Sequence, residues 1–169
     1  MRLDHLGRLP FHLFVRDLCG YQYVDNSPVR CQLADFAESI FHAWMDTRNT
    51  LRHRVKAAAI VPRKAGKSTI WTQSLPIYGL AYDPNLAWVI DGETKTKAND
   101  FLGATSRIIG GSVDTPFVKV LGNWRPSQGD RDRKWTDDCV DIAPKTYLQR
   151  KEHSIGTCSV DIGYTGGAP

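Results

Sequence analysis

Residues that favour burial recur at helical spacing in two long parts of the chain. In the first part they follow the i, i+3, i+4, i+7, i+8 and i+11 pattern of one helix face. Ser27 provides an N-cap for this helix and Pro28 its first residue. The second helix is capped by Thr94 and ends at the glycine pair 110–111. The residues on the two predicted faces are Leu33, Phe36, Ala37, Ile40, Phe41 and Trp44, and then Ala98, Phe101, Leu102, Thr105, Ile108 and Ile109.

Two short apolar runs predict buried strands. The first lies within residues 54–61 and is ended by Pro62, because proline cannot donate to a central ladder. The second covers residues 86–90 and follows a turn sequence. Between them, residues 67–75 predict a helix, which Pro76 should kink or end. The order strand, helix, strand, helix is that of a parallel α/β sheet.

The two ends of the chain carry weaker patterns. Residues 1–27 form a mixed lead-in, so that we expect the main domain to cover residues 28–169. We expect a solvated polar loop at 125–138, which contains Trp135. The remaining predicted pieces are an apolar segment at 115–122 and short strands at 139–143, 146–149 and 153–161.

Composition places the chain among ordinary globular proteins. It has 169 residues, of which 41% are hydrophobic and 24% charged, enough for one domain with a core. The longest apolar run, 57–62, falls far short of the roughly 20 residues that cross a bilayer. The first residues do not read as a secretory signal, and the four cysteines lack the Cys-x-x-Cys spacing of zinc sites. We therefore expect reduced thiols and a cytosolic protein.

Positive charge is concentrated in one stretch. The net charge of the chain is +4, yet residues 47–82 contain no Asp or Glu and carry seven of the 22 basic residues. The rest of the chain then has 15 basic residues against all 18 acids. Such a stretch is commonly a solvated basic face, but around a phosphate loop it also suits a polyphosphate or a nucleic acid.

A Gly-Lys-Ser sequence lies within this basic stretch, between the first predicted strand and the helix that follows. In a Walker A loop, backbone N–H groups and the helix N-terminus surround the phosphates, a lysine reaches the β and γ oxygens, and a hydroxyl binds Mg²⁺. Lys67 and Ser68 supply that lysine and hydroxyl, and Gly66 lets the backbone approach. The first glycine of the usual motif is replaced by Val61.

The segment Pro62–Ser68 resembles the Walker A loop of the large terminase subunit of tailed phages, which often has the form Pro-Arg-x-x-Gly-Lys-Ser without the leading glycine. The resemblance implies a P-loop NTPase fold of the RecA-like type, a parallel sheet with flanking helices, and ATP with Mg²⁺ as ligands. It makes Gln32 the residue that contacts adenine and Ser68 the metal ligand. The implied ATP-binding loop residues are Pro62, Arg63, Lys64, Ala65, Gly66, Lys67, Ser68 and Thr69.

Looser likenesses to the same family run through the later part of the chain. They comprise the strand and acidic turn at 88–93, the segment 117–124, residues 150–154 and the Thr-Gly at 165–166. The family implies a motor that couples ATP hydrolysis to movement of double-stranded DNA into the capsid. Its partners are the portal protein and the small terminase subunit, in an oligomeric ring in the host cytoplasm at the procapsid portal.

The family pattern is incomplete in this sequence. No apolar strand ending in two acids, the Walker B element, follows the loop, and the nuclease domain of the family is absent. We therefore expect an N-terminal part of the ATPase domain that binds nucleotide and hydrolyses it poorly. The alternatives are a non-catalytic remnant that binds portal, small subunit or DNA, and another P-loop protein such as a helicase-like ATPase or a small kinase.

Three further residues have a conceivable role in the chemistry. Arg63 lies inside the loop, where a guanidinium can stabilise charge on the transferred phosphoryl group, and a solvated arginine is the alternative. Asp91 and Glu93 end a strand where ligands of α/β proteins bind, and a magnesium or water-positioning role there is the alternative to the simpler interpretation, an acidic helix start.

Overall fold

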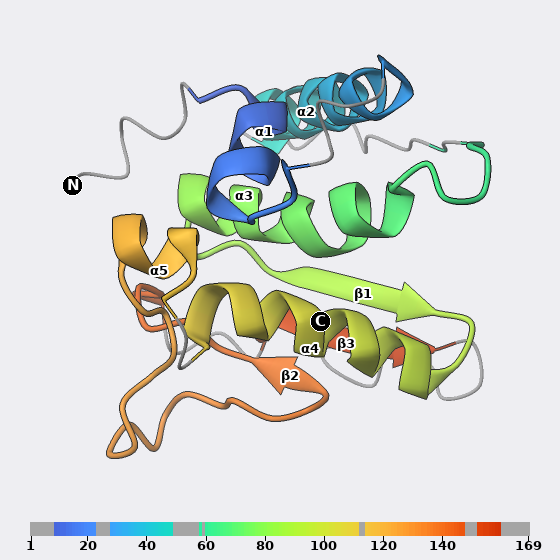
Figure 1. Ribbon diagram of the computed structural model, residues 1–169. Coiled ribbons are helices and arrows are strands. Elements are labelled where there is room, and N and C mark those ends of the chain that lie inside the picture. The colour runs from blue at the N-terminus through green and yellow to red at the C-terminus, as the bar shows by residue number, and fades with distance from the viewer. Residues whose placement is uncertain are drawn as a thin grey trace.

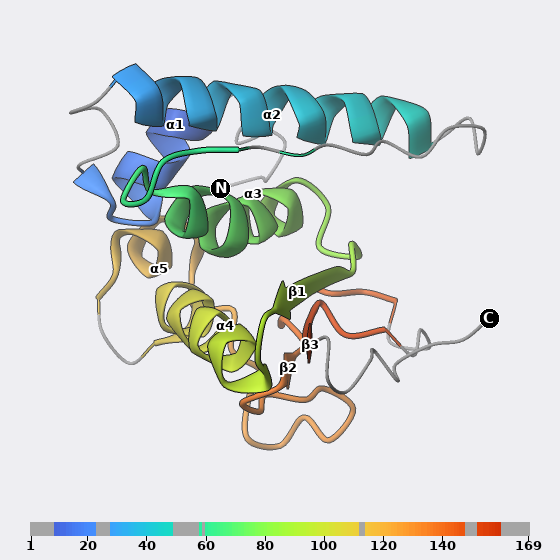
Figure 2. The ribbon, with the colours of Figure 1, turned by 90° about the vertical axis from the view of Figure 1, so that its right-hand side faces the viewer.

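The computed structural model describes residues 9–22, 28–48, 58, 60–111, 114–147 and 152–159. The long helix α2 lies above a second helix, which in turn lies above a small sheet, and α4 covers one face of that sheet (Figures 1 and 2). The helices are α1 (Phe11–Leu13), continued by π-helical turns at Phe14–Leu18, α2 (Pro28–Arg48), a π-helical segment Ser68–Ser74 continued by α3 (Leu75–Tyr82), α4 (Lys95–Gly110) and α5 (Pro116–Leu121). The strands are β1 (Trp88–Gly92), β2 (Cys139–Val140) and β3 (Ile155–Ser159).

Helix α2 confirms the first helical prediction, with Leu33, Ala37 and Phe41 buried as expected. Its proposed cap, Ser27, lies outside the described residues. Phe36 departs from the prediction, because it is 43% exposed, although its ring lies 5.6 Å from that of Trp71 between centroids. The buried face of α2 is therefore narrower than the periodicity indicates.

The N-terminal lead-in forms a helix that packs into the same core. Phe11 and Phe14 are fully buried, and their rings lie 5.0 Å and 5.2 Å from that of Tyr78 on α3. The Tyr78 hydroxyl donates to Glu38 of α2 at 3.3 Å, and the backbone N–H of Phe11 donates to the other Glu38 oxygen at 3.1 Å. Burial and then the neighbouring Glu38 charge raise the pKa of Tyr78, so that its hydroxyl stays a donor. One tyrosine thus joins three helices.

The helix after the basic loop continues through Pro76, contrary to the prediction that it would kink or end there. The preceding turns are π-helical, and the backbone N–H of Leu75 donates to the carbonyl of Ile70, five residues back. Regular α-helix begins again at Leu75, so that Pro76 falls in its first turn, where a missing N–H is tolerated.

The sheet has the order β1–β3–β2, with β1 parallel and β2 antiparallel to β3. Helix α4 lies between β1 and β3 in sequence and covers the sheet, in which β1 and β3 are parallel, while the antiparallel β2 makes the whole sheet mixed (Figure 1). The strand predicted at 86–90 is shifted to 88–92, because Asp91 and Gly92 pair with Cys158 and Ser159.

Beyond β1, the structure confirms the predicted cap of α4 and corrects the predictions for Trp135 and Thr146. The Thr94 hydroxyl caps α4 by accepting from the backbone N–H of Lys97 at 3.3 Å. Trp135 is not in a freely solvated loop, because its ring packs over Gly110 and the Arg125 guanidinium lies 5.8 Å from its centroid. Thr146 and the residue after it are not in a strand, since both backbone N–H groups donate to Asn85.

Most of the strand predicted at 54–61 lies outside the described residues, so that this prediction stays untested. At its described end, Ile60 is fully exposed and Val61 packs partly against the core. In the part of the chain that the structure describes, no helix has both the length and the apolar character needed to cross a bilayer.

Gly79 of α3 packs against Trp88 of β1, so that replacing this glycine by alanine should change the stability in the direction opposite to that usual in a helix. Alanine normally stabilises a helix relative to glycine by about 0.5–1 kcal/mol. A Cβ on Gly79, however, would lie 2.4 Å from Cζ2 of Trp88, so that we expect Gly79→Ala to destabilise the protein by about 1–3 kcal/mol. The matched control is Gly103→Ala in α4, whose Cβ would meet nothing closer than 3.9 Å and should stabilise. Urea unfolding of both variants measures the change in their free energy of unfolding, and a change of the same sign in both would contradict the prediction.

Candidate functional site

The loop before the second helix has a backbone shaped by two residues in the left-handed region. Lys64 has a φ of +66° and Gly66 a φ of +82°, and Lys64 is alone among the described non-glycine residues in having a positive φ. The N–H of Ala65 between them turns back to the carbonyl of Pro62 at 3.4 Å. Alternation of this kind turns successive N–H groups toward a common concave side, the arrangement that binds anions in proteins.

The loop leads directly into the helix that begins at Lys67. The N–H of Ile70 donates to the carbonyl of Gly66 at 2.9 Å, and the Ile70 side chain is fully buried. This buried side chain holds the first turn in place, with the positive end of the helix dipole at the loop. Lys67 is exposed and Ser68 is half-buried at this end of the helix.

A pocket of about 540 Å³ opens at this point. The residues that line it are Arg30, Arg63, Lys64, Gly66, Lys67, Ser68 and Thr69. Four of these seven carry a positive charge and none is acidic. Several cations around one concave site create a field that favours a multiply charged anion.

The structure brings together most, but not all, of the residues that the sequence singles out. Pro62 and Ala65 shape the loop without lining the pocket, and Gln32 is exposed on α2 and does not line it. Arg30, which the sequence analysis missed, comes from α2 instead. Residues two apart on a helix differ by about 200° in direction, so that Arg30 and Gln32 face different ways.

The loop lies on the same side of the molecule as the carboxyl ends of β1 and β3 (Figure 1). Ligands of α/β proteins bind on that side of the sheet. The two acids at the end of β1 have local partners: Asp91 accepts from the thiol of Cys158 at 3.4 Å, and Glu93 pairs with Lys97, whose hydrogen bond lowers the pKa of Glu93. Glu93 therefore has the role of an exposed helix-start acid, the simpler of its two interpretations.

Comparisons with protein-family models, with curated proteins and with solved structures found no significant match to this chain.

A second polar cluster, which the sequence analysis did not find, lies directly after β2 in the chain. Asp141 and Lys145 are almost fully buried, and the Lys145 ammonium donates to the Asp141 carboxylate at 2.8 Å. The same carboxylate accepts from the backbone N–H groups of Lys134 and Ser154, and its second oxygen lies 2.9 Å from Nδ1 of His153. The role of His153 has no local signal in the sequence, because its partner lies 12 positions away.

Burial alone would raise the pKa of Asp141, but the hydrogen bonds from Lys145 and His153 outweigh it and lower the pKa. A carboxyl group whose pKa is lowered by folding stabilises the protein above its unfolded pKa of about 4, and this stability is lost as the pH falls through the folded value. The cluster therefore holds Lys134 and Ser154 against Asp141 at neutral pH and weakens under acid conditions.

We expect Asp141→Asn to lower the free energy of unfolding at pH 7 by about 3–5 kcal/mol, because it leaves the Lys145 charge buried without a counter-ion. The variant should also lose less stability than the wild type between about pH 5 and pH 2. Asp114→Asn, which removes an exposed carboxylate 3.8 Å from Lys119, is the control and should change stability by less than about 0.5 kcal/mol. Denaturant titrations across this pH range measure both effects, and parallel pH profiles for wild type and Asp141→Asn would contradict the assignment.

Proposed function

We propose that this protein binds ATP together with Mg²⁺ in the basic pocket at the start of the helix that follows Gly66. The observation that carries the proposal is the pocket itself, in which four cations and no acid surround the N-terminal turn of a helix. The left-handed residues Lys64 and Gly66 support it, because they give the loop the backbone of an anion-binding nest.

Each residue of the pocket has a role that follows from its chemistry. Lys67 provides a mobile ammonium for the β and γ phosphate oxygens, and the backbone N–H groups at the helix start bind the same chain of phosphates. Ser68 provides the hydroxyl that would hold Mg²⁺ between protein and nucleotide. Arg63 is exposed beside the loop, where its guanidinium can neutralise charge on the terminal phosphate.

The wider proposal is that this site belongs to the ATPase of a large terminase subunit. The Pro-Arg-x-x-Gly-Lys-Ser form of residues 62–68 supports it, together with the acid-free basic stretch around the loop. In that proposal the nucleotide site powers the movement of double-stranded DNA, and the portal protein and small terminase subunit are its partners. Gln32 keeps its proposed role as the adenine contact in this assembly.

Lys67→Ala tests nucleotide binding. We expect it to weaken binding of a fluorescent ATP analogue in the presence of Mg²⁺ by at least tenfold, because it removes a charged hydrogen-bond donor to the phosphates. Lys97→Ala, which removes an exposed lysine of α4 outside the pocket, should bind like the wild type. Fluorescence anisotropy measures the affinities, and wild-type affinity in Lys67→Ala would overturn the proposal.

Hydrolysis is a separate property, because it requires a group that orients the attacking water. The seven residues that line the pocket include no carboxylate. We therefore expect this chain to bind Mg²⁺ and ATP while its steady-state ATPase rate stays close to that of Lys67→Ala. A rate well above that control would show that a residue not yet assigned completes the catalytic site.

A further inference from the structure

Arg30 reaches the basic pocket from a part of the chain more than 30 residues before the loop. It is in the first turn of α2 and lines the pocket together with the loop residues. Its Cγ and Cδ atoms lie 3.9 Å from the point that a Cβ on Gly66 would occupy. The aliphatic part of Arg30 therefore packs beside the glycine that opens the loop.

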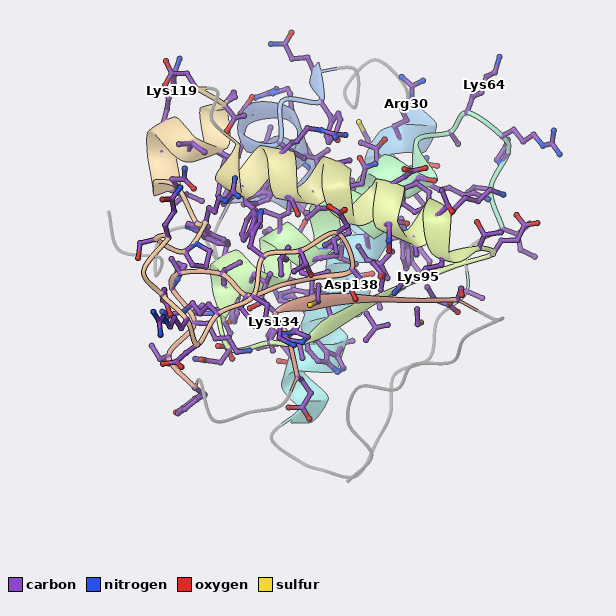
Figure 3. All side chains as sticks on the ribbon, turned by 90° about the horizontal axis from the view of Figure 1, so that it is seen from below. Arg30, Lys64, Lys95, Lys119, Lys134 and Asp138 are labelled. Atoms are coloured by element: carbon purple, nitrogen blue, oxygen red, sulfur yellow. The ribbon has the colours of Figure 1, made fainter. Side chains whose placement is uncertain are left out.

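The figures show the same juxtaposition. The start of α2 lies beside the segment 60–66 in both ribbon views (Figures 1 and 2). Arg30 and Lys64 lie toward one end of the molecule in Figure 3, while Lys119 lies at the opposite end. Two separate elements, α2 and the loop, thus contribute cations to one pocket.

The composition of the pocket decides which part of a nucleotide Arg30 would meet. None of the seven lining residues in the described part of the chain is aromatic, so that none of them offers a ring on which a base could stack. An arginine has five donors and no acceptor, and its planar fork matches two oxygens of a phosphate group. Three of the other lining residues are cations as well, which favours the phosphate chain over the sugar or base.

We propose that Arg30 is a phosphate-binding residue of the nucleotide site. Its guanidinium binds the triphosphate from the α2 side, while Lys67 binds it from the loop side. This inference rests on the proposed function and adds a residue outside the loop motif to it. Binding of the triphosphate would then hold the start of α2 against the loop, because one anion bridges cations from both elements.

The experiment compares Arg30→Ala, Arg30→Lys and the control Lys119→Ala in the full chain. A fluorescent ATP analogue is displaced by ATP or by inorganic tripolyphosphate, each with Mg²⁺. We expect Arg30→Ala to weaken both competitors by the same factor of about ten, because the lost contact is to phosphate and not to the base. Arg30→Lys should recover most of that loss by keeping the charge, and Lys119→Ala should match the wild type.

The outcomes separate the two proposals. If the wild type binds the analogue and Lys67→Ala does not, while Arg30→Ala binds like the wild type, the nucleotide site stands and Arg30 has no part in it. If neither the wild type nor any variant binds, the proposed function itself fails. A loss of ATP affinity without a loss of tripolyphosphate affinity would assign Arg30 to the base or sugar and overturn the inference. Thermal unfolding without nucleotide, equal in all four proteins, shows that a change in affinity is not a folding defect.

Discussion

The packing around Tyr78 is the constraint on which the rest of the structure depends. Its buried ring contacts Phe11, Phe14 and Phe41, with Phe41 at 5.3 Å between centroids, and its hydroxyl is bound by Glu38. Edge-to-face aromatic contacts of this kind add directional preference to the burial of large apolar surfaces. The helix that contains Tyr78 has the basic loop at its other end. The packing around Tyr78, two to three turns away, therefore sets the position of the loop relative to α2.

The basic pocket is an example of a site that two elements create together. The loop motif is local, and Lys67 and Ser68 could be recognised because a glycine, a lysine and a hydroxyl in that order have one well-known chemistry. Arg30 has no such signal in the sequence, since nothing around it distinguishes it from a solvated arginine. Only the parallel run of α2 and the helix after the loop, whose starts lie side by side, brings it to the glycine of the loop (Figure 2).

The fold was predictable where burial follows a regular period and unpredictable where it depends on distant partners. Helices α2 and α4, the Thr94 cap and the strands near residues 90 and 157 follow from periodicity and capping chemistry. The helix at Phe11–Leu18 was missed although Phe11, Phe14, Val15 and Leu18 have the i, i+3, i+4, i+7 spacing, because the segment is only about two turns long. Trp135 was misjudged because its polar neighbours hide the packing on Gly110, and the buried Asp141–Lys145 pair is visible only when the chain is folded.

The π-helical turns before Pro76 set the relative orientation of the two ends of the helix that contains them. Each residue of a regular helix advances by about 100°, so that one extra residue in a wide turn rotates everything beyond it by roughly that amount. Ser68 at the loop and Tyr78 in the core therefore owe their relative directions to the wide turns between them. Deleting a single residue there would leave the sequences on either side unchanged, yet it would turn the basic loop away from α2 and separate the residues that line the pocket.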